Sequence, residues 1–293
     1  MGYRKDFYVD PASRLHLGKL DTAGCGHETA ESANAKTDHF RRRLAELQAL
    51  LYAGKQRSVL VVLQAMDTGG KDGTVSHVFT GLNPQGTSVT SFKQPTPTEL
   101  AHDFLWRVHP HVPAHGEIAV FNRSHYEDVL VTRVHKLIGR DTWAARCGRI
   151  RAFEESLAGS GTAILKFFLH ISKEEQLARF GQRLADPARN WKISEADYAE
   201  RDLWDDYIRT YEAVLEATST PAAPWYVIPS DHKWFRNLAV SSIIANTMDG
   251  LGLSFPEPSV DLAAIRRKYH AAGAAAETVR TVRTHAHADA DAG

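Results

Sequence analysis

The residues best suited to chemistry lie in one short segment, QAMDTGGKDGT, at residues 64–74. Its spacing approaches the phosphate-binding pattern G-x-x-x-x-G-K-[ST], in which backbone N–H groups and a lysine hold phosphate oxygens. Gly70 and Lys71 occupy their expected positions, but Ala65 replaces the first glycine and Asp72 replaces the hydroxyl residue. We therefore expect a phosphate-binding loop with altered chemistry.

Neither replacement removes the capacity of this loop to bind phosphate. Backbone N–H groups at a helix N-terminus bind phosphate oxygens whatever the side chains are, and Lys71 adds a point charge. The hydroxyl that usually binds magnesium is missing, so a carboxylate must replace it, with Asp67 as first candidate and Asp72 as second. The alternative is a glycine-rich turn without a ligand. The other residues of the expected phosphate cradle are Thr68, Gly69, Gly70, Gly73 and Thr74.

A second set of chemical groups follows the apolar run that ends at Phe121. Asn122 and Arg123 would lie at the carboxyl edge of a parallel sheet, where open α/β folds bind ligands. Asn122 is a candidate metal ligand, because P-loop kinases place a metal-binding aspartate nearby, and Arg123 can hold a phosphate through two N–H groups. Glu127 is either a site residue or a partner of its own helix N-terminus. Further phosphate- or nucleotide-binding candidates are Lys93 and Arg133.

Four cations gather in the segment ARFGQRLADPARNWK. Arg179 and Arg183 stand four residues apart and share a helix face, and Arg189 and Lys192 follow in a proline-containing turn. P-loop kinases build a mobile lid over phosphates from such a helical hairpin, so we predict a lid at about 173–205. The alternative is a solvated helix face whose cations pair with nearby acidic residues.

Apolar runs that alternate with helical patterns must position these groups. Five short apolar runs predict strands, and SVLVVLQA, residues 58–65, suits a strand buried on both faces. Alternation of strands and helices predicts an α/β fold, with a central parallel sheet and helices on both of its faces. The other four predicted strands end near Phe92, Phe121, Leu169 and Ile228.

The helical patterns predict what connects these strands. One helix is expected to start at Lys71 and another near Ser124. Ser172 with Glu175 three residues later has the spacing of a capping box at a helix start. The other predicted helices cover 96–108, 141–158, 172–186 and 194–218.

Composition restricts the classes of partner. Of 293 residues, 43% are hydrophobic, which allows a substantial core. Lys and Arg number 35 and Asp and Glu number 35, so a polyanion must be met by locally clustered charge, and a general nucleic-acid binder is disfavoured. Two cysteines fit a reducing compartment. Without a signal-like segment or a bilayer-spanning apolar run, we expect a cytoplasmic protein that binds neither nucleic acid nor membrane.

Motifs spread over most of the chain, from about Asp6 to Leu253, resemble the family-2 polyphosphate kinases, which transfer a terminal phosphate between inorganic polyphosphate and nucleotides. FNRSHYEDVLV is most similar to the class III branch, whose members accept AMP as well as ADP. In ADP-restricted relatives the position of Glu127 is usually asparagine. One departure is Ser76, where the family pattern has a lysine. The other motifs that carry the resemblance are LQAMDTGGKDGT, GLNPQGTSVTSFKQPT, DFLWRVHPHVP, WKISEADYAERDLWDDY and TSTPAAPWYVIPSDHKWFRN.

The resemblance implies a fold, a site and partners. The fold is a three-layer α/β/α sandwich of the P-loop kinase, thymidylate-kinase-like type with a helical lid. The implied function is reversible transfer of the terminal phosphate of polyphosphate to AMP and ADP, giving ADP and ATP. The implied cofactor is Mg²⁺, with Mn²⁺ as the alternative, and the implied assembly is a homo-oligomer, a dimer or tetramer. The alternatives are an ATP-dependent nucleotide kinase and a non-catalytic polyphosphate-binding protein. The implied catalytic residues are Asp67, Lys71, Arg123, Glu127 and Arg183. The candidate metal ligands are Asp67 and, from its place at the strand end, Asn122.

The domain boundaries follow from the same patterns. We expect an irregular N-terminal arm at 1–27 and a P-loop kinase domain at 28–258. The Ala-rich segment 259–293 is expected to be helical at first and disordered at its end.

Overall fold

The computed structural model describes residues 2–273, and the chain divides into two units, the first ending at Ser254 and the second beginning at Phe255. Within the second unit, residues 262–273 form a helix. The disordered end that we predicted for the tail lies outside the described residues. No helix in residues 2–273 has the length and apolar character needed to cross a membrane.

The first unit is built on a sheet of five strands that are all parallel, in the order β2-β3-β1-β4-β5. The central strand β1 is buried along its whole length, as its apolar stretch from Val59 to Leu63 favours. All five predicted strands are confirmed, with small shifts at their ends. Their bounds are β1 Ser58–Ala65, β2 Thr87–Ser91, β3 Ile118–Asn122, β4 Thr162–His170 and β5 Trp225–Pro229.

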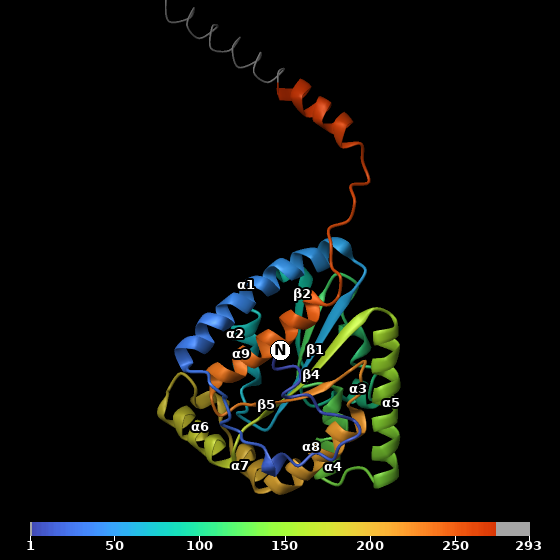
Figure 1. Cartoon of the computed structure of the whole chain (residues 1–293). Helices are drawn as coiled ribbons and strands as arrows, with labels where there is room; N and C mark the ends of the chain where they lie inside the picture. The colour runs from blue at the N-terminus through green and yellow to red at the C-terminus, as the bar shows by residue number, and fades with distance from the viewer. Residues whose placement is uncertain (1, 274–293) are drawn as a thin grey trace, which may run out of the picture. The chain divides into compact units, whose positions relative to one another are not determined.

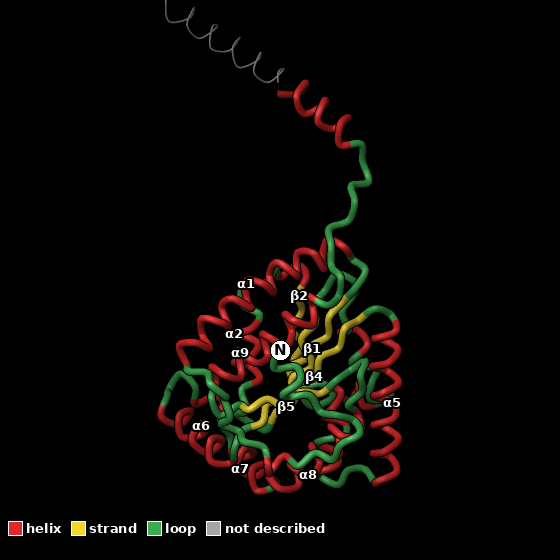
Figure 2. Tube along the Cα trace, in the orientation of Figure 1, coloured by secondary structure: helices red, strands yellow, loops and turns green. Residues whose placement is uncertain are grey.

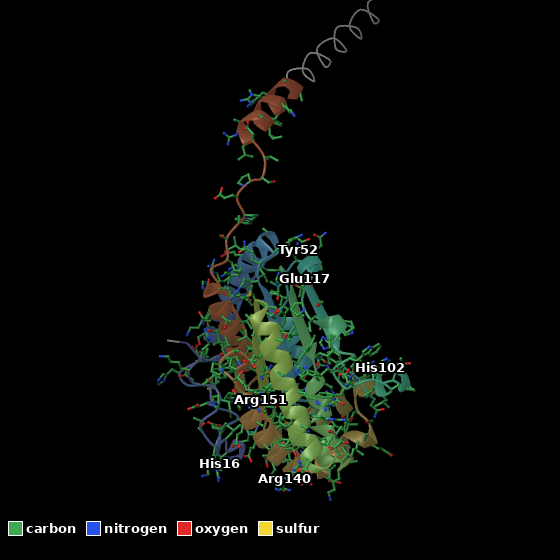
Figure 3. All side chains as sticks on the ribbon, turned by 90° about the vertical axis from the view of Figure 1, so that its right-hand side faces the viewer. His16, Tyr52, His102, Glu117, Arg140 and Arg151 are labelled. Atoms are coloured by element: carbon green, nitrogen blue, oxygen red, sulfur yellow. The ribbon has the colours of Figure 1, made fainter. Side chains whose placement is uncertain are left out.

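Helices cover both faces of this sheet and form a three-layer α/β/α sandwich (Figures 1 and 2). On one face lie α1 (Ala30–Gly54), α2 (Lys71–Val78) and α9 (Lys233–Asp249); on the other lie α5 (Arg140–Gly159) and α8 (Trp204–Thr218). Figure 3 views the second face, where α5 runs from Arg140 past Arg151. The predicted fold class is therefore confirmed.

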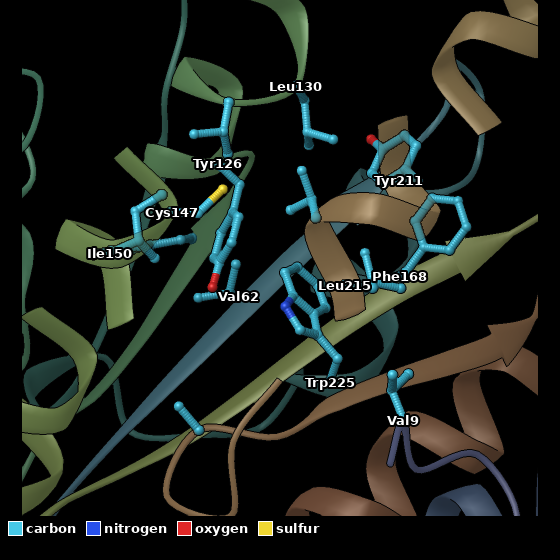
Figure 4. Close-up of a cluster of buried hydrophobic side chains, with 14 of the residues drawn as sticks. Val9, Val62, Tyr126, Leu130, Cys147, Ile150, Phe168, Tyr211, Leu215 and Trp225 are labelled. Atoms are coloured by element: carbon cyan, nitrogen blue, oxygen red, sulfur yellow. The ribbon is translucent and has the colours of Figure 1, made fainter. Parts of the chain in front are cut away.

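The core between the sheet and α5 and α8 is rich in aromatic rings (Figure 4). Tyr126 and Trp225 meet edge to face with ring centroids 4.8 Å apart, and Phe168 packs on Tyr211 with centroids 4.2 Å apart. Such rings bury large areas, so this layer contributes much of the hydrophobic stabilisation. Tyr126 follows β3 closely in the chain, so the core reaches directly beneath the loop after that strand.

The N-terminal segment is irregular but packed against the first unit. Tyr8 forms an antiparallel bridge with Tyr226, and the Val9 N–H donates to the Trp225 carbonyl over 2.9 Å. Leu17 is fully buried. The segment thus covers the free edge of β5, an edge that would otherwise expose unpaired backbone groups.

Three helix predictions were wrong in extent. The helix predicted for 96–108 is one turn, α3 (Pro97–Leu100), because side chains such as Asp103, which accepts from the Leu105 N–H, compete for the backbone. Near Ser124 the chain forms a 3-10 turn, His125–Asp128, before the short α4, because the Ser124 hydroxyl accepts from the Tyr126 N–H. The remaining short helices are α4 (Val131–Val134), α6 (Lys173–Ala185) and α7 (Glu195–Asp202).

The third of these errors is the helix predicted for 194–218. It is broken at Leu203 into α7 and α8. The helix α8 buries Trp204, Tyr207 and Tyr211 in the core, whereas α7 buries no residue. The two halves therefore face different surroundings, and the break lets α8 turn its aromatic face inward.

Candidate active site

The loop between β1 and α2 has the backbone shape of a phosphate cradle. Gly70 caps α2 in the left-handed region, with φ at 100°, and Thr68 also has a positive φ of 60°. A Cβ atom on Gly69 would lie 2.4 Å from the Ala65 Cβ, and one on Gly70 would lie 1.8 Å from the Arg236 Nη1. Close approach therefore requires a glycine at position 69, and the positive φ favours one at position 70. The loop leads into the N-terminus of α2, where backbone N–H groups can bind phosphate.

A cavity of about 1030 Å³ lies over this loop, at the carboxyl ends of β1, β2 and β3. It brings together most of the residues predicted from the sequence, including those of the phosphate loop, the end of β3 and the helical hairpin. The predicted residues that line it are Asp67, Thr68, Gly69, Gly70, Lys71, Asp72, Gly73, Lys93, Asn122, Arg123, Arg179, Arg183, Arg189 and Lys192.

Three predicted residues do not line the cavity. Thr74 is buried, and its hydroxyl donates to the Gly70 carbonyl within the first turn of α2. The Arg133 guanidinium lies over the ring of Trp143. Glu127 stands behind Arg123, with 3.9 Å between its carboxylate and the Arg123 Nη1.

Lys71 is held at the base of the cradle. Its ammonium donates to the carbonyl of Ala65 over 2.9 Å, at the end of β1. Burial, reinforced by the charge of Arg123, lowers the pKa of Lys71 to about 8, against the opposing effect of Asp67, Glu127 and Asp72. Its charge is therefore poorly compensated by the protein and available to an anion.

Arg123 lies between two carboxylates. Its Nη2 donates to the Asp67 Oδ1 over 3.1 Å, and its Nη1 faces Glu127. Burial lowers the pKa of Arg123, but Glu127 and Asp67 outweigh it and the net shift is upward. Burial raises the pKa of Glu127 despite Arg123 and Lys71. The carboxylates thus fix the guanidinium, which must stay charged to bind phosphate.

Asp72 faces the cavity from the first turn of α2 and contacts two predicted residues. It accepts from the Asn122 side-chain amide over 2.8 Å and from the Lys192 ammonium over 3.3 Å. Burial raises the pKa of Asp72, but hydrogen bonds from Asn122 and Lys192 outweigh it, so the pKa is lowered. The carboxylate is thus ionised near neutral pH, and Lys192 of the hairpin is tied to the phosphate loop.

The oxygen atoms at this site fit a divalent cation that takes its remaining ligands from the phosphates of a substrate. Asp67 and Asp72 both line the cavity, whereas residues 2–273 contain no group of three or more acidic, histidine or cysteine side chains placed to hold a metal. Magnesium is commonly bound by one or two carboxylates together with phosphate oxygens and water. The protein thus supplies a donor set of that kind.

Two arginines of α6 have different surroundings. The Arg179 guanidinium is buried and donates to Glu175 and to the backbone carbonyls of Thr68, Ser230 and Asp231. Most of its N–H groups are therefore used within the protein, and Arg179 ties α6 to the phosphate loop and to the end of β5. The Arg183 Nη1 donates to the Lys192 carbonyl, which leaves the rest of its guanidinium for a ligand.

Three residues at the start of α9 also lie close to the cradle and were not predicted from the sequence: Lys233, Arg236 and Asn237. Arg236 is only 2% exposed, yet in the described chain its guanidinium hydrogen-bonds only Asn237 and pairs with no carboxylate. Burial and the nearby Arg179 lower the pKa of Arg236 to about 9.

The signal for these residues was available in the order of the elements. The segment SDHKWFRN follows β5, so its cations had to reach the same sheet edge. The other lining residues that were not predicted are Ser76, His77, Ser91, Phe92, Gln94, Gln182, Trp191 and Asp197.

Comparison with known proteins agrees with this geometry. Residues 27–253 match the family model described as Polyphosphate kinase 2 (PPK2). The chain belongs to the polyphosphate kinase 2 family. It is 51% identical over 259 residues to an AMP/ADP-polyphosphate phosphotransferase of Meiothermus ruber, covering 87% of this chain and 96% of that one. It is 46% identical over 266 residues to an ADP-polyphosphate phosphotransferase of Rhodopseudomonas palustris, covering 86% and 92%.

The fold of this polyphosphate kinase 2 member matches a solved structure of the family. The crystal structure of Polyphosphate Kinase 2 from Arthrobacter aurescens TC1 superposes with a TM-score of 0.89 at 40% identity, covering 92% of this chain and 96% of that one. The resemblance inferred from the motifs is confirmed. The protein is therefore a phosphotransferase of the kinase type.

The lowered pKa of Lys71 generates a prediction on the binding of polyphosphate. A lysine with a pKa of about 8 is charged below that pH and neutral above it, and only the charged form attracts phosphate. We expect the dissociation constant of a short polyphosphate to rise about fourfold from pH 7 to pH 8.5 as Lys71 loses its proton. Isothermal titration calorimetry at both pH values measures it.

The matched control is Lys71→Met, which should bind polyphosphate more weakly at both pH values and lose this pH dependence. The upper limit of pH 8.5 keeps Arg236, whose pKa is about 9, mostly charged. If the dissociation constant rose by the same factor between the two pH values in the wild type and in Lys71→Met, Lys71 would not be the group that titrates.

Proposed function

We propose that this protein transfers the terminal phosphate of inorganic polyphosphate to AMP and ADP, reversibly, giving ADP and ATP. The observation that carries the proposal is the charge of the cavity. Nine lysine or arginine side chains and three aspartates line it, on a chain whose formal net charge is zero. A cavity with this imbalance favours a long polyanion, because separate phosphates along the chain can meet separate cations.

The cations divide between two sides of the phosphate loop. Arg236 approaches Gly70 and Gly73 from α9, where Lys233 also lines the cavity, and Arg183, Arg189 and Lys192 line it from the α6–α7 hairpin. This arrangement supports a phosphate chain that runs between the two groups and presents its end near Lys71 and Arg123. The hairpin would then exclude water from the reacting phosphate, which is the role of a lid.

The residues around Lys71 support a transfer by positioning and charge stabilisation. Lys71 and Arg123 would stabilise the charge on the transferred phosphoryl group, and Arg183 would add a third cation from the hairpin. Glu127 would act through Arg123, because it contacts that guanidinium rather than the cavity. Arg179 would position α6 and the phosphate loop, since most of its donors bond to the protein.

Asp67 is our first candidate for holding Mg²⁺, or Mn²⁺ in its place, with Asp72 and Asn122 nearby. When bound, the cation neutralises phosphate oxygens and orients them for transfer. The Asp67 Oδ1 accepts from Arg123, so the same carboxylate can hold the arginine with one oxygen and a cation with the other.

Compartment and assembly are further parts of the proposal. Cys25 and Cys147 are both free thiols, which supports a reducing compartment such as the cytoplasm. The family resemblance supports a homo-oligomer, a dimer or tetramer, which light scattering would measure. Neither point alters the chemistry proposed for one chain.

The donor is tested by incubating the protein with AMP, magnesium and polyphosphate, without ATP. We expect ADP and then ATP to form, and Lys71→Ala to lower turnover about a hundredfold through lost charge stabilisation. Transfer from ATP but not from polyphosphate would instead identify an ATP-dependent nucleotide kinase. Polyphosphate binding without transfer from either donor would identify a binding protein. Chromatographic separation of the nucleotides distinguishes these outcomes.

Acceptor choice is tested at Glu127. Its carboxylate orients Arg123, and AMP is the acceptor with fewer phosphate oxygens to hold it in place, so it depends more on a correctly oriented arginine. We expect Glu127→Asn to lower the rate with AMP about tenfold more than the rate with ADP, or ~1.4 kcal/mol. Glu155→Gln, at an exposed position of α5, is the control and should change neither rate. Equal losses with both acceptors would remove Glu127 from acceptor selection.

A further inference from the structure

A buried ionic network lies beneath the turn that carries Arg123 and Glu127, outside the cavity. Its charged members are Lys166, in the middle of β4, and Glu154, on α5, whose side chains are 0% and 1% exposed. The Lys166 ammonium donates to the Glu154 Oε2 over 2.6 Å. Neither residue lines the cavity, and the proposed transfer assigns neither of them a role.

Every hydrogen-bonding group of the lysine is used. Besides Glu154, the Lys166 ammonium donates to the Tyr126 hydroxyl over 2.9 Å and to the Thr218 carbonyl at the end of α8 over 2.8 Å. Glu154 accepts with its second oxygen, Oε1, from the Tyr126 hydroxyl over 2.7 Å. The same oxygen lies 3.4 Å from the Nε2 of His125, so the network joins α5, β4 and α8 to two adjacent residues of the turn, His125 and Tyr126.

Tyr126 is the link between this network and the cavity. Its ring points into the core beside Trp225 (Figure 4), and its hydroxyl is the only polar atom of the side chain. Its N–H donates to the Ser124 hydroxyl, which in turn accepts from the Gln64 side chain of β1. The position of Tyr126 is thus fixed at both its hydroxyl and its backbone.

Burying this ion pair in the core costs free energy. Charges removed from water lose hydration, and apolar residues of similar volume often stabilise a protein as well or better. Stability alone does not account for it. What the network specifies is the position of Tyr126 and its neighbour His125, and the next residue along the chain is Glu127.

Arg123, three residues before Tyr126, needs such support. Its φ of 60° lies in the left-handed region, which is sparsely populated by residues other than glycine. Strained conformations persist only where the surroundings determine them. The 3-10 turn His125–Asp128 follows at once, so a shift of Tyr126 would move both Arg123 and Glu127.

We propose that Lys166, Glu154 and Tyr126 are positioning residues, which hold the turn after β3 so that Arg123 faces the reacting phosphates with Glu127 behind it. The effect of these three residues on turnover rests on the proposed function. Their effect on the placement of the turn does not, and hydrogen exchange measures it separately.

The sharpest single variant is Tyr126→Phe, which removes one hydroxyl and leaves the ring and the Lys166–Glu154 pair. We expect turnover with AMP to fall about tenfold while the KM for polyphosphate stays within about twofold, because binding cations elsewhere in the cavity are unchanged. In hydrogen exchange, the amides of residues 123–128 should exchange about tenfold faster, with those of β1 and β4 unaffected. Tyr226→Phe alters a buried tyrosine of β5 whose ring packs in the core on the opposite face of the sheet from Tyr126, and it should change none of these quantities.

A second variant keeps the test decisive if Tyr126→Phe is poorly folded. The triple variant Tyr126→Phe, Glu154→Met and Lys166→Met replaces the network by apolar side chains of similar length. We expect its melting temperature to equal or exceed that of Tyr126→Phe, with the same loss of turnover and the same local gain in exchange. A purely structural network would instead give normal turnover in the folded triple variant.

The outcomes separate this proposal from the proposed function. Normal turnover in the triple variant, or faster exchange spread evenly over the sheet in Tyr126→Phe, would overturn the proposal that the network positions the turn. If the wild type transfers no phosphate at all, the proposed function fails, and the exchange pattern alone decides whether the network positions the turn.

Discussion

Positive charge that the protein itself does not neutralise is the constraint on which this structure depends. Arg236 is buried against the phosphate loop and pairs with no carboxylate of residues 2–273, and Lys71 is held at the base of the loop with a lowered pKa. Burying a cation without a partner costs free energy, and like charges placed together add to that cost. The rest of the fold must supply enough stability to hold them there, and a bound polyanion would relieve both costs.

The strand order makes this concentration of charge geometrically simple. The sheet is parallel throughout, so the segments after β1, β3 and β5 all emerge at one edge. They carry Lys71, Arg123 and Arg236, which lie far apart in the sequence and meet at one cavity. Hydrophobic layers on both faces of the sheet stabilise the arrangement. The carboxylates at the site, such as Asp67, orient individual cations rather than neutralise the group.

Much of this could be predicted from the sequence, because buried strands and phosphate loops have local signatures. The β-branched, mostly apolar run at 58–65 and the glycines beside Lys71 define β1 and its loop without any tertiary information. The helix predicted for 96–108 failed because Asp103 and similar residues bond to nearby backbone groups, a competition that a hydrophobic pattern does not reveal.

The remaining features depend on long-range contacts. Arg236 is one of two cations on α9, and only the packing of that helix against the phosphate loop distinguishes it. Lys166 is visible as a lysine within an apolar strand, but its partners Glu154 and Tyr126 come from other elements. Arg179 shares a helix face with Arg183, as the spacing predicts, yet its donors are consumed by backbone carbonyls. Spacing identifies neighbours on one element and leaves open what faces them.

The most direct test of the central claim is the thermal unfolding of Arg236→Met with and without a short polyphosphate. If Arg236 is an uncompensated buried charge that a phosphate chain neutralises, the ligand-free variant should melt no lower than the wild type. The polyphosphate-induced rise in melting temperature should be largely lost, because affinity for the folded state falls. Arg42→Met, which removes the same charge from an exposed position on α1, should retain the full rise. The account would be contradicted if polyphosphate raised the melting temperature of Arg236→Met as much as that of the wild type, and if the ligand-free variant melted below the ligand-free wild type.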